Sequence, residues 1–150
     1  MILFIGCQGA GKTTFYRERF FDSHVRVSLD MLKTRNRERL LVSACLHMRQ
    51  PFVVDNTNPT AKDRQRYFDL ACGSGFRVIG YYFEATIEEL LHRNARRKGK
   101  QVIPEIGVRA TLRKLEPPAY EEGFDALFLV RAGPGGAYEV EKMQREASRS

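Results

Sequence analysis

The chain opens with a short apolar segment that runs directly into a glycine-rich loop, MILFIGCQGAGKTT. Residues Gly6–Thr13 match the pattern GxxxxGK followed by Ser or Thr in full. In this motif the backbone N–H groups of the loop and the N-terminus of the next helix bind phosphate oxygens, and the glycines permit the close approach. The motif needs a strand before the loop and a helix after it, so it constrains the fold more than any other stretch. It predicts a site for nucleotide phosphates.

The residues of this loop have distinct expected roles. Lys12 should reach the β- and γ-phosphates of ATP, and Thr13 should bind Mg²⁺. The residues expected to hold the nucleotide are Gly6, Gly9, Ala10, Gly11, Lys12, Thr13 and Thr14. The glycine spacing GxGxxG of dinucleotide-binding folds is absent, which argues against a nicotinamide or flavin cofactor.

Short apolar segments alternate with longer segments of helical periodicity along the chain. The expected strands are residues 2–5, 25–29, 52–54, 76–84 and 126–131, of which 76–84 is the longest. The expected helices are residues 12–21, 31–49, 86–97 and 104–115, with one more between residues 60 and 73. This alternation predicts βαβ units and a parallel sheet covered on both faces. We therefore predict an α/β fold, a three-layer αβα sandwich of the P-loop NTPase type with about five parallel strands.

A length of 150 residues suits one domain, and no Pro/Gly/Ser-rich linker divides the chain. We expect residues 1–132 to form that domain and residues 133–150 to be a frayed C-terminal tail, because they are glycine-rich and then charged. No apolar run approaches the ~20 residues of a membrane span. The cysteines Cys7, Cys45 and Cys72 are odd in number and lack metal-ligand spacing, so we expect a reducing, cytoplasmic location.

The formal net charge is +7, and the basic residues concentrate in two segments, Lys33–Arg39 and His92–Lys100. A charge of this size is consistent either with simple solubility or with a polyanionic partner such as nucleic acid. The charge alone does not choose between these explanations.

Two aspartates follow predicted strands, at the edge of a parallel sheet where ligands bind. Asp30 follows the second strand; it is explained either as an ordinary helix N-cap or as a general base that accepts the proton of an attacking hydroxyl. Lys33 lies one helical turn further on and would share its face, where a cation could hold an anion of the acceptor. Asp55 follows the third strand and is either a turn residue or a carboxylate that holds Mg²⁺.

The cluster HRNARRKGK is explained either as a solvated helix face or as part of a lid. Arg93 and Arg97 are four residues apart, so they share one helix face, and a loop with the sequence KGKQ follows. Phosphoryl transfer requires cations on the transferred group and exclusion of water. We therefore predict an adenylate-kinase-like lid that carries Arg93 and Arg97 as catalytic residues.

Several stretches taken together resemble one family. They are GCQGAGKTTF, VSLDML, VVDNTNPT, RNARR and LEPPAYEEGFD, and they look like the 5′-kinase domain of polynucleotide kinases, which include a phage end-healing enzyme and an animal DNA-repair enzyme. The match runs in order from Ile2 to about Val130. The resemblance implies transfer of the ATP γ-phosphate to a 5′-hydroxyl end of DNA or RNA. It further implies that Asp30 is the general base, Lys33 binds the acceptor's phosphate, and Asp55 supports that contact or the metal.

This sequence departs from the family pattern at three points. Lys33 stands where the phage enzyme has an arginine, and a lysine binds a phosphate as a point charge and not as a bidentate fork. Leu29 stands where the family often has an arginine. No DxD motif occurs in the chain, so we expect no phosphatase activity of the kind that accompanies this kinase in phage and animal members.

The sequence is also consistent with two alternatives to a polynucleotide kinase. A kinase of a small metabolite, such as a sugar, a nucleoside or an antibiotic, would share the loop, the aspartate and the lid, but would enclose its acceptor in a pocket. A non-catalytic ATP-binding module is less consistent with the intact set of Lys12, Thr13, Asp30, Asp55 and the two lid arginines. The sequence predicts neither the oligomeric state nor a preference for DNA or RNA.

Overall fold

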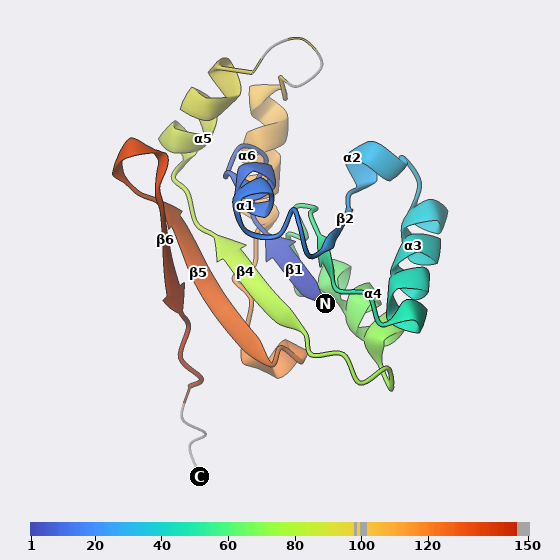
Figure 1. Cartoon of the computed structure of the whole chain (residues 1–150). Helices are drawn as coiled ribbons and strands as arrows, with labels where there is room; N and C mark the ends of the chain where they lie inside the picture. Colours follow the sequence, from blue (N-terminus) through green and yellow to red (C-terminus); the bar gives the residue numbers. More distant parts are fainter. Residues whose placement is uncertain (98, 100–101, 147–150) are drawn as a thin grey trace.

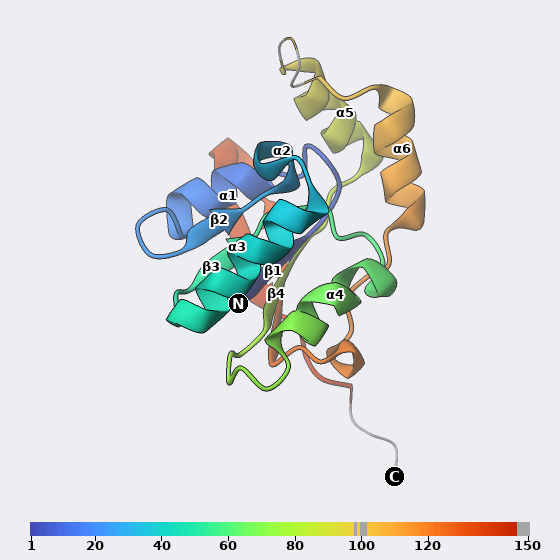
Figure 2. The same ribbon diagram turned by 90° about the vertical axis from the view of Figure 1, so that its right-hand side faces the viewer.

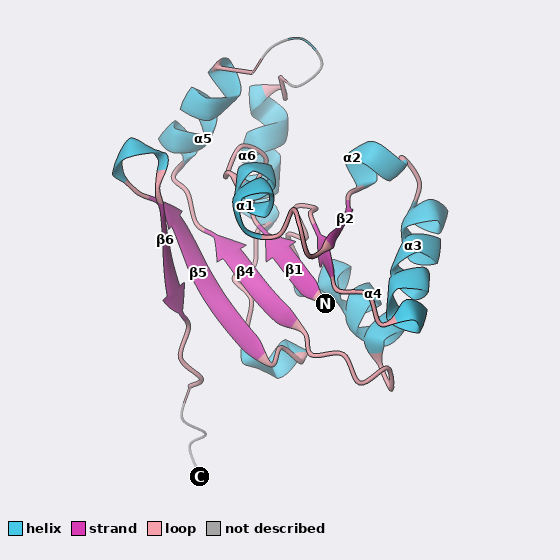
Figure 3. Cartoon of the chain, in the orientation of Figure 1, coloured by secondary structure: helices cyan, strands magenta, loops and turns pink. Residues whose placement is uncertain are grey.

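The computed structural model describes residues 1–97, 99 and 102–146, and its strands form one six-stranded sheet (Figure 1, Figure 3). The strands are β1 Ile2–Ile5, β2 Val25–Val27, β3 Phe52–Val54, β4 Ile79–Phe83, β5 Ala126–Ala132 and β6 Tyr138–Lys142. They lie in the order β2-β3-β1-β4-β5-β6. The first five are parallel, and β6 pairs antiparallel with β5. The predicted α/β fold with five parallel strands is confirmed, and an antiparallel edge strand is added to it.

Helices cover both faces of this sheet (Figure 2). The helices are α1 Lys12–Arg19, α2 Leu29–Leu32, α3 Arg35–Met48, α4 Ala61–Ala71, α5 Ile87–Ala95 and α6 Glu105–Lys114. Successive side chains of β1 point to opposite faces. Leu3 and Ile5 therefore join the core formed with α3 and α4. Ile2 and Phe4 join the core that contains Phe15 of α1, together with buried residues of α5 and α6.

The carboxyl ends of the parallel strands meet at one edge, the upper edge in Figure 1. The register pairs Val54 with both Leu3 of β1 and Val27 of β2. The segments that follow β1, β2 and β3 therefore start side by side. These segments are the glycine-rich loop, α2 and the stretch that begins with Asp55. The fold thus brings three separate parts of the sequence to one place.

The expected helix over residues 31–49 is wrong in one respect, because it is two helices. The segment first turns into α2 directly after β2, so the predicted strand 25–29 ends at Val27. Lys33 then ends α2 with a φ of 73°. Thr34 begins α3 as its N-cap, and its side-chain oxygen accepts a hydrogen bond from the Arg37 backbone N–H at 3.1 Å. This cap satisfies a helix N–H that would otherwise be unpaired, and it therefore favours the start of a new helix at this point.

The prediction that residues 76–84 form the longest strand is also wrong. β4 has five residues and β5 has seven. The ladder starts late because the backbone N–H of Val78 bonds to the Asp125 carboxylate at 2.7 Å. A side chain thus replaces the neighbouring strand as its acceptor.

The expected frayed tail from residue 133 is wrong for its first part. Residues Pro134–Gly136 form a turn, and Tyr138–Lys142 then form β6 against β5, with Val140 opposite Val130. Charged residues alternate with Tyr138 and Val140 along β6, a composition typical of an edge strand that avoids further pairing. Among the described residues, no helix is both long enough and apolar enough to cross a bilayer.

A fully buried arginine connects the segment after β3 to the segment before β5. Arg64 of α4 donates from Nε and Nη2 to the two carboxylate oxygens of Glu122, at 2.7 and 2.9 Å. Its Nη1 donates to the backbone carbonyls of Asn58 and Glu116, at 2.9 and 3.2 Å. A bidentate pair supported by two further hydrogen bonds from the same guanidinium is an arrangement in which a buried charge is tolerated.

We predict that Glu122→Ala lowers the free energy of unfolding by about 3–5 kcal/mol, because it leaves the Arg64 guanidinium buried without a counter-ion. Urea denaturation followed by circular dichroism measures this change. Glu121 is the neighbouring exposed carboxylate, and Glu121→Ala should stay within about 0.5 kcal/mol of the natural protein. Equal denaturation midpoints for the two variants would contradict the prediction.

Candidate active site

The glycine-rich loop connects β1 to the start of α1. Gly11 is the N-cap of α1 with a φ of 93°, and no side chain caps the helix there. Lys12 is buried, and its Nζ donates to the carbonyls of Gly6 and Cys7 at 2.8 and 2.7 Å. A helix N-terminus without a side-chain cap, next to a lysine ammonium, is an arrangement that binds anions.

Burial lowers the pKa of Lys12 to about 8, and the nearby Asp55 carboxylate opposes part of that shift. The ammonium is destabilised because it is buried, and its hydrogen-bond partners among the described residues are two neutral carbonyls. An anion bound in the loop would stabilise the charged form. A bound phosphate would therefore raise the pKa of Lys12.

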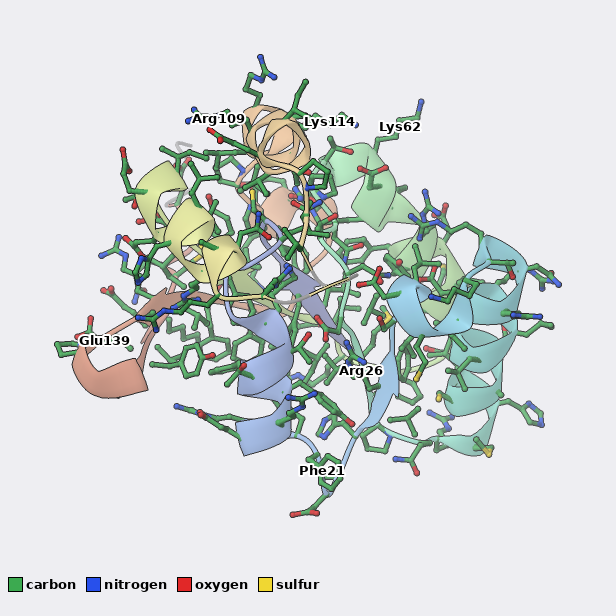
Figure 4. All side chains as sticks on the ribbon, turned by 90° about the horizontal axis from the view of Figure 1, so that it is seen from above. Phe21, Arg26, Lys62, Arg109, Lys114 and Glu139 are labelled. Carbon is green, nitrogen blue, oxygen red and sulfur yellow. The ribbon has the colours of Figure 1, made fainter. Side chains whose placement is uncertain are left out.

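Asp55 connects the loop to β2. Its Oδ2 accepts a hydrogen bond from the Thr13 hydroxyl at 3.0 Å and from Nε of Arg26 at 2.8 Å. Arg26 Nη2 also donates to the Thr13 oxygen at 3.3 Å. Figure 4 shows the Arg26 side chain between α1 and β2. A hydroxyl and a guanidinium thus both donate to the Asp55 carboxylate, and Asp55 is only 6% exposed.

A cavity of about 280 Å³ opens over this cluster. Its lining includes Gln8, Gly9, Lys12, Thr13, Arg26, Asp30, Asp55, Asn56, Thr57 and Arg97. Asp30 lies in the first turn of α2 and its side chain is accessible to solvent. The cavity therefore contains the lysine of the glycine-rich loop and an accessible carboxylate. We call it the Asp30 cavity.

A second cavity, of about 320 Å³, also adjoins the loop. Its lining is Gly9, Gly11, Thr14, Arg93, Arg97, Gly136 and Tyr138. The Tyr138 hydroxyl donates to the Gly11 carbonyl at 2.8 Å, and Arg93 Nη1 donates to the Gly9 carbonyl at 3.2 Å. A Cβ added to Gly11 would lie within 3 Å of both side chains. We call this the Tyr138 cavity; it shares Gly9 and Arg97 with the Asp30 cavity.

Most of the predicted site residues line one of the two cavities; Gly6 and Ala10, which belong to the loop itself, and Lys33 line neither. The Asp30 cavity contains Lys12, Thr13, Asp30, Asp55 and Arg97, and the Tyr138 cavity contains Thr14 and Arg93. Lys33 is exposed and lines neither cavity, because α2 ends before it and it does not share a helix face with Asp30. The loop KGKQ after Arg97 lies outside the described residues except for Gly99.

Two residues of the site were not predicted from the sequence. Arg26 occupies the middle of the short strand VRV, and a cation between two valines is a signal that a carboxylate partner lies near. That partner is Asp55, which follows the neighbouring strand. Tyr138 comes from the segment expected to be frayed, and nothing local in the sequence connects it to the loop.

The donor set around Thr13 is compatible with a metal ion bound mainly by phosphate oxygens. Thr13 and Asp55 provide a hydroxyl and a carboxylate that already contact each other. Within residues 1–97, 99 and 102–146, no three His, Cys, Asp or Glu side chains are grouped as a metal site. Mg²⁺ prefers a few oxygen ligands from the protein together with substrate phosphates and water, so this sparse set fits Mg²⁺ delivered with a nucleotide.

Comparison with known proteins relates the chain to one family and to several kinases. A family model described as an AAA domain matches residues 1–118. A bifunctional polynucleotide phosphatase/kinase from Schizosaccharomyces pombe is 26% identical over 128 residues, which are 83% of this chain and 31% of that protein. The chain spans about a third of the length of the curated relatives it matches.

Two solved structures show the same fold. A gluconokinase from Sinorhizobium meliloti superposes with a TM-score of 0.61 at 20% identity, covering 89% of this chain and 83% of that one. A chain of the Pnkp1/Rnl/Hen1 complex superposes with a TM-score of 0.54 at 18% identity, covering 98% of this chain and 46% of that one. Residues 1–118, which the family model matches, include the glycine-rich loop and the ends of β2 and β3, which Asp30 and Asp55 follow. The chain therefore belongs to the AAA domain family of P-loop proteins and has the α/β P-loop kinase fold.

Proposed function

We propose that the chain is an ATP-dependent kinase that transfers the γ-phosphate to a 5′-hydroxyl end of DNA or RNA. The observation that carries this proposal is the Asp30 cavity, in which Lys12 of the loop and the accessible carboxylate of Asp30 share one space. A module that only holds ATP has no need of an accessible carboxylate beside the phosphates. A kinase needs one to accept the proton of the attacking hydroxyl.

The two cavities suggest how donor and acceptor are arranged. The phosphates would lie on the loop, where both cavities meet at Gly9 and Arg97. The nucleoside of ATP would occupy the Tyr138 cavity, which offers the aromatic ring of Tyr138 for stacking on a base. The acceptor would then enter the Asp30 cavity from the opposite side, in line with the γ-phosphorus.

In the proposed reaction each residue has one task. Asp30 accepts the proton of the acceptor hydroxyl as the hydroxyl oxygen attacks the γ-phosphorus, and the bond from that phosphorus to the β,γ-bridging oxygen breaks to release ADP. Lys12, Arg93 and Arg97 spread the negative charge of the transferred group, and Arg26 binds the acceptor side of the site through its guanidinium. Thr13 and Asp55 would hold Mg²⁺, which neutralises phosphate charge when bound. When a phosphate binds, Lys12 Nζ would first leave the carbonyls of Gly6 and Cys7 and bind the phosphate instead.

A nucleic-acid acceptor is supported by the charge around the Asp30 cavity and by the similarity to the S. pombe protein. Lys33, Arg37 and Arg39 are exposed where α2 passes into α3, directly after Asp30. A phosphodiester backbone is stabilised by lysines and arginines along its path. In this proposal Lys33 is part of the basic surface outside the cavity. Inside the cavity, Arg26 binds the acceptor's phosphate, the role that the sequence analysis assigned to Lys33.

We predict that Asp30→Asn lowers kcat by about 10²–10⁴-fold, because it removes the general base, while the affinity for ATP stays within about twofold. The assay uses γ-labelled ATP and Mg²⁺ with a 5′-hydroxyl oligonucleotide beside a panel of sugars and nucleosides. Asp22→Asn, a change of an exposed aspartate before β2, serves as the matched control. Label transfer to a sugar in preference to the oligonucleotide would overturn the proposed acceptor, and full activity of Asp30→Asn would overturn the proposed base.

We predict a pH dependence of nucleotide binding from Lys12. Its pKa in the free protein is lowered to about 8, and bound phosphates raise it. Below pH 8 Lys12 is already protonated and the affinity for ATP is flat. Above pH 8 binding must take up a proton, so the affinity falls by up to about tenfold for each pH unit. Calorimetry at pH 9 in two buffers of different ionisation enthalpy should detect uptake of about 0.9 proton.

Lys12→Met should abolish this pH dependence and weaken ATP binding at every pH. Lys62→Met, which changes an exposed lysine of α4 that Figure 4 shows projecting outward, should leave both unchanged. An affinity for ATP that stays constant from pH 7 to pH 9.5 in the natural protein would contradict the assignment of Lys12 as the phosphate-binding group.

A further inference from the structure

The position of Asp30 depends on contacts from outside its own helix. α2 has only four residues, and its N-cap residue Ser28 makes no side-chain hydrogen bond to the helix. A single turn of helix is unstable in water because its formation costs the entropy of several residues for one hydrogen bond. Its first backbone N–H groups also need acceptors that the helix cannot supply. Another part of the molecule must fix the start of α2.

Asn56, directly after Asp55, makes that contact. Its Oδ1 accepts a hydrogen bond from the Leu29 backbone N–H at 2.9 Å. Its Nδ2 donates to Glu38 Oε2 at 2.7 Å and to the Tyr67 hydroxyl oxygen at 3.1 Å. A carboxamide can accept on one side while it donates on the other. Asn56 thus connects the first residue of α2 to α3 and α4.

Glu38 of α3 sets the orientation of that carboxamide. It is 2% exposed, and besides Asn56 it accepts from Arg35 Nη1 at 2.9 Å and from the Tyr67 hydroxyl at 3.2 Å. Burial raises the pKa of Tyr67 to about 12, so its hydroxyl stays protonated and donates. A carboxylate only accepts hydrogen bonds. The NH₂ group of Asn56 must therefore face Glu38, and its oxygen must face Leu29.

Direct catalytic roles fit these two residues less well. Glu38 does not line the Asp30 cavity, and its oxygens already bond to three side chains. Asn56 does line the cavity, but its oxygen and its nitrogen both have partners within the protein. Their polar groups are directed at each other and at Leu29.

We propose that Asn56, oriented by Glu38 and Tyr67, is a positioning residue that fixes the first turn of α2 and thereby holds the Asp30 carboxylate at the acceptor. This inference rests on the proposed role of Asp30 as general base. It assigns a function to the Asn of the DNT stretch beyond that of a turn residue. It also explains why a buried carboxylate is kept on α3, one helix away from the chemistry.

The test exchanges donor and acceptor across the Asn56–Glu38 contact. Asn56→Asp keeps an oxygen for Leu29 but sets a second carboxylate against Glu38, so we expect kcat to fall by about 100-fold, the size of effect that a displacement of about 1 Å produces. Glu38→Gln combined with Asn56→Asp restores one donor and one acceptor, since the introduced amide can donate to the introduced carboxylate. The double variant should recover kcat to within about tenfold of the natural protein. Glu38→Gln alone is the matched control.

Asn56→Ala is a second variant that adds no charge, and it keeps the test decisive if Asn56→Asp does not fold. It should lower kcat with little change in the KM for ATP, and Glu38→Gln should not rescue it. Adding Asp30→Asn to Asn56→Ala should lower kcat much less than Asp30→Asn does in the natural protein, because the base is already misplaced. A full and independent loss from Asp30→Asn in that background would overturn the positioning role.

A readout that needs no acceptor separates this inference from the proposed function. Hydrogen exchange of the Leu29 amide, measured by NMR, should be at least about tenfold faster in Asn56→Ala than in the natural protein, since the amide loses its acceptor. Unchanged exchange at Leu29 would overturn the positioning role even if the kinase is active. Faster exchange at Leu29 in a protein that phosphorylates no acceptor would support the anchoring of α2 while the proposed function fails.

Discussion

The Asp55 carboxylate is the contact on which the geometry of the site depends. It follows β3, between the strand that leads to the phosphate-binding loop and the strand that leads to α2. One of its oxygens accepts from Thr13 on the loop side and from Arg26 on the β2 side. Because the carboxylate is buried, both donors are needed to offset the loss of water around the charge. The loop and β2 are thereby held at a fixed separation before any ligand arrives.

This arrangement divides the space around the loop into two unlike parts. The Asp30 cavity is lined by charged groups of both signs, whereas the Tyr138 cavity offers an aromatic ring, glycines and two arginines. Both arginines and Tyr138 approach the loop from parts of the chain remote in sequence, and Arg93 and Tyr138 already bond to its carbonyls. In the proposed function, a nucleotide that enters would replace the bond of Arg93 to the Gly9 carbonyl with a contact to its phosphates. The loop is therefore held in place by the groups that would later bind the donor.

Much of the fold and part of the site could be predicted from the sequence, because local patterns determine them. The loop motif and the apolar strands place Lys12, Thr13, Asp30 and Asp55 at one edge of a parallel sheet, and the structure places them there. What could not be predicted depends on contacts between distant segments. The expected helix is interrupted because Lys33 ends α2 and Thr34 begins α3, so Lys33 does not share a helix face with Asp30. The partners of Arg26, Asn56 and Tyr138 lie 29, 18 and 127 residues away, and no periodicity links such pairs.

The most direct test of the account is a crystal structure with Mg²⁺, ADP, aluminium fluoride and a 5′-hydroxyl dinucleotide. We predict the ADP nucleoside in the Tyr138 cavity and the Asp30 carboxylate within about 3 Å of the acceptor oxygen, which lies in line with the aluminium. An adenosine seated in the Asp30 cavity would contradict this prediction. So would an acceptor oxygen bound by some other base while the Asp30 carboxylate points away into solvent.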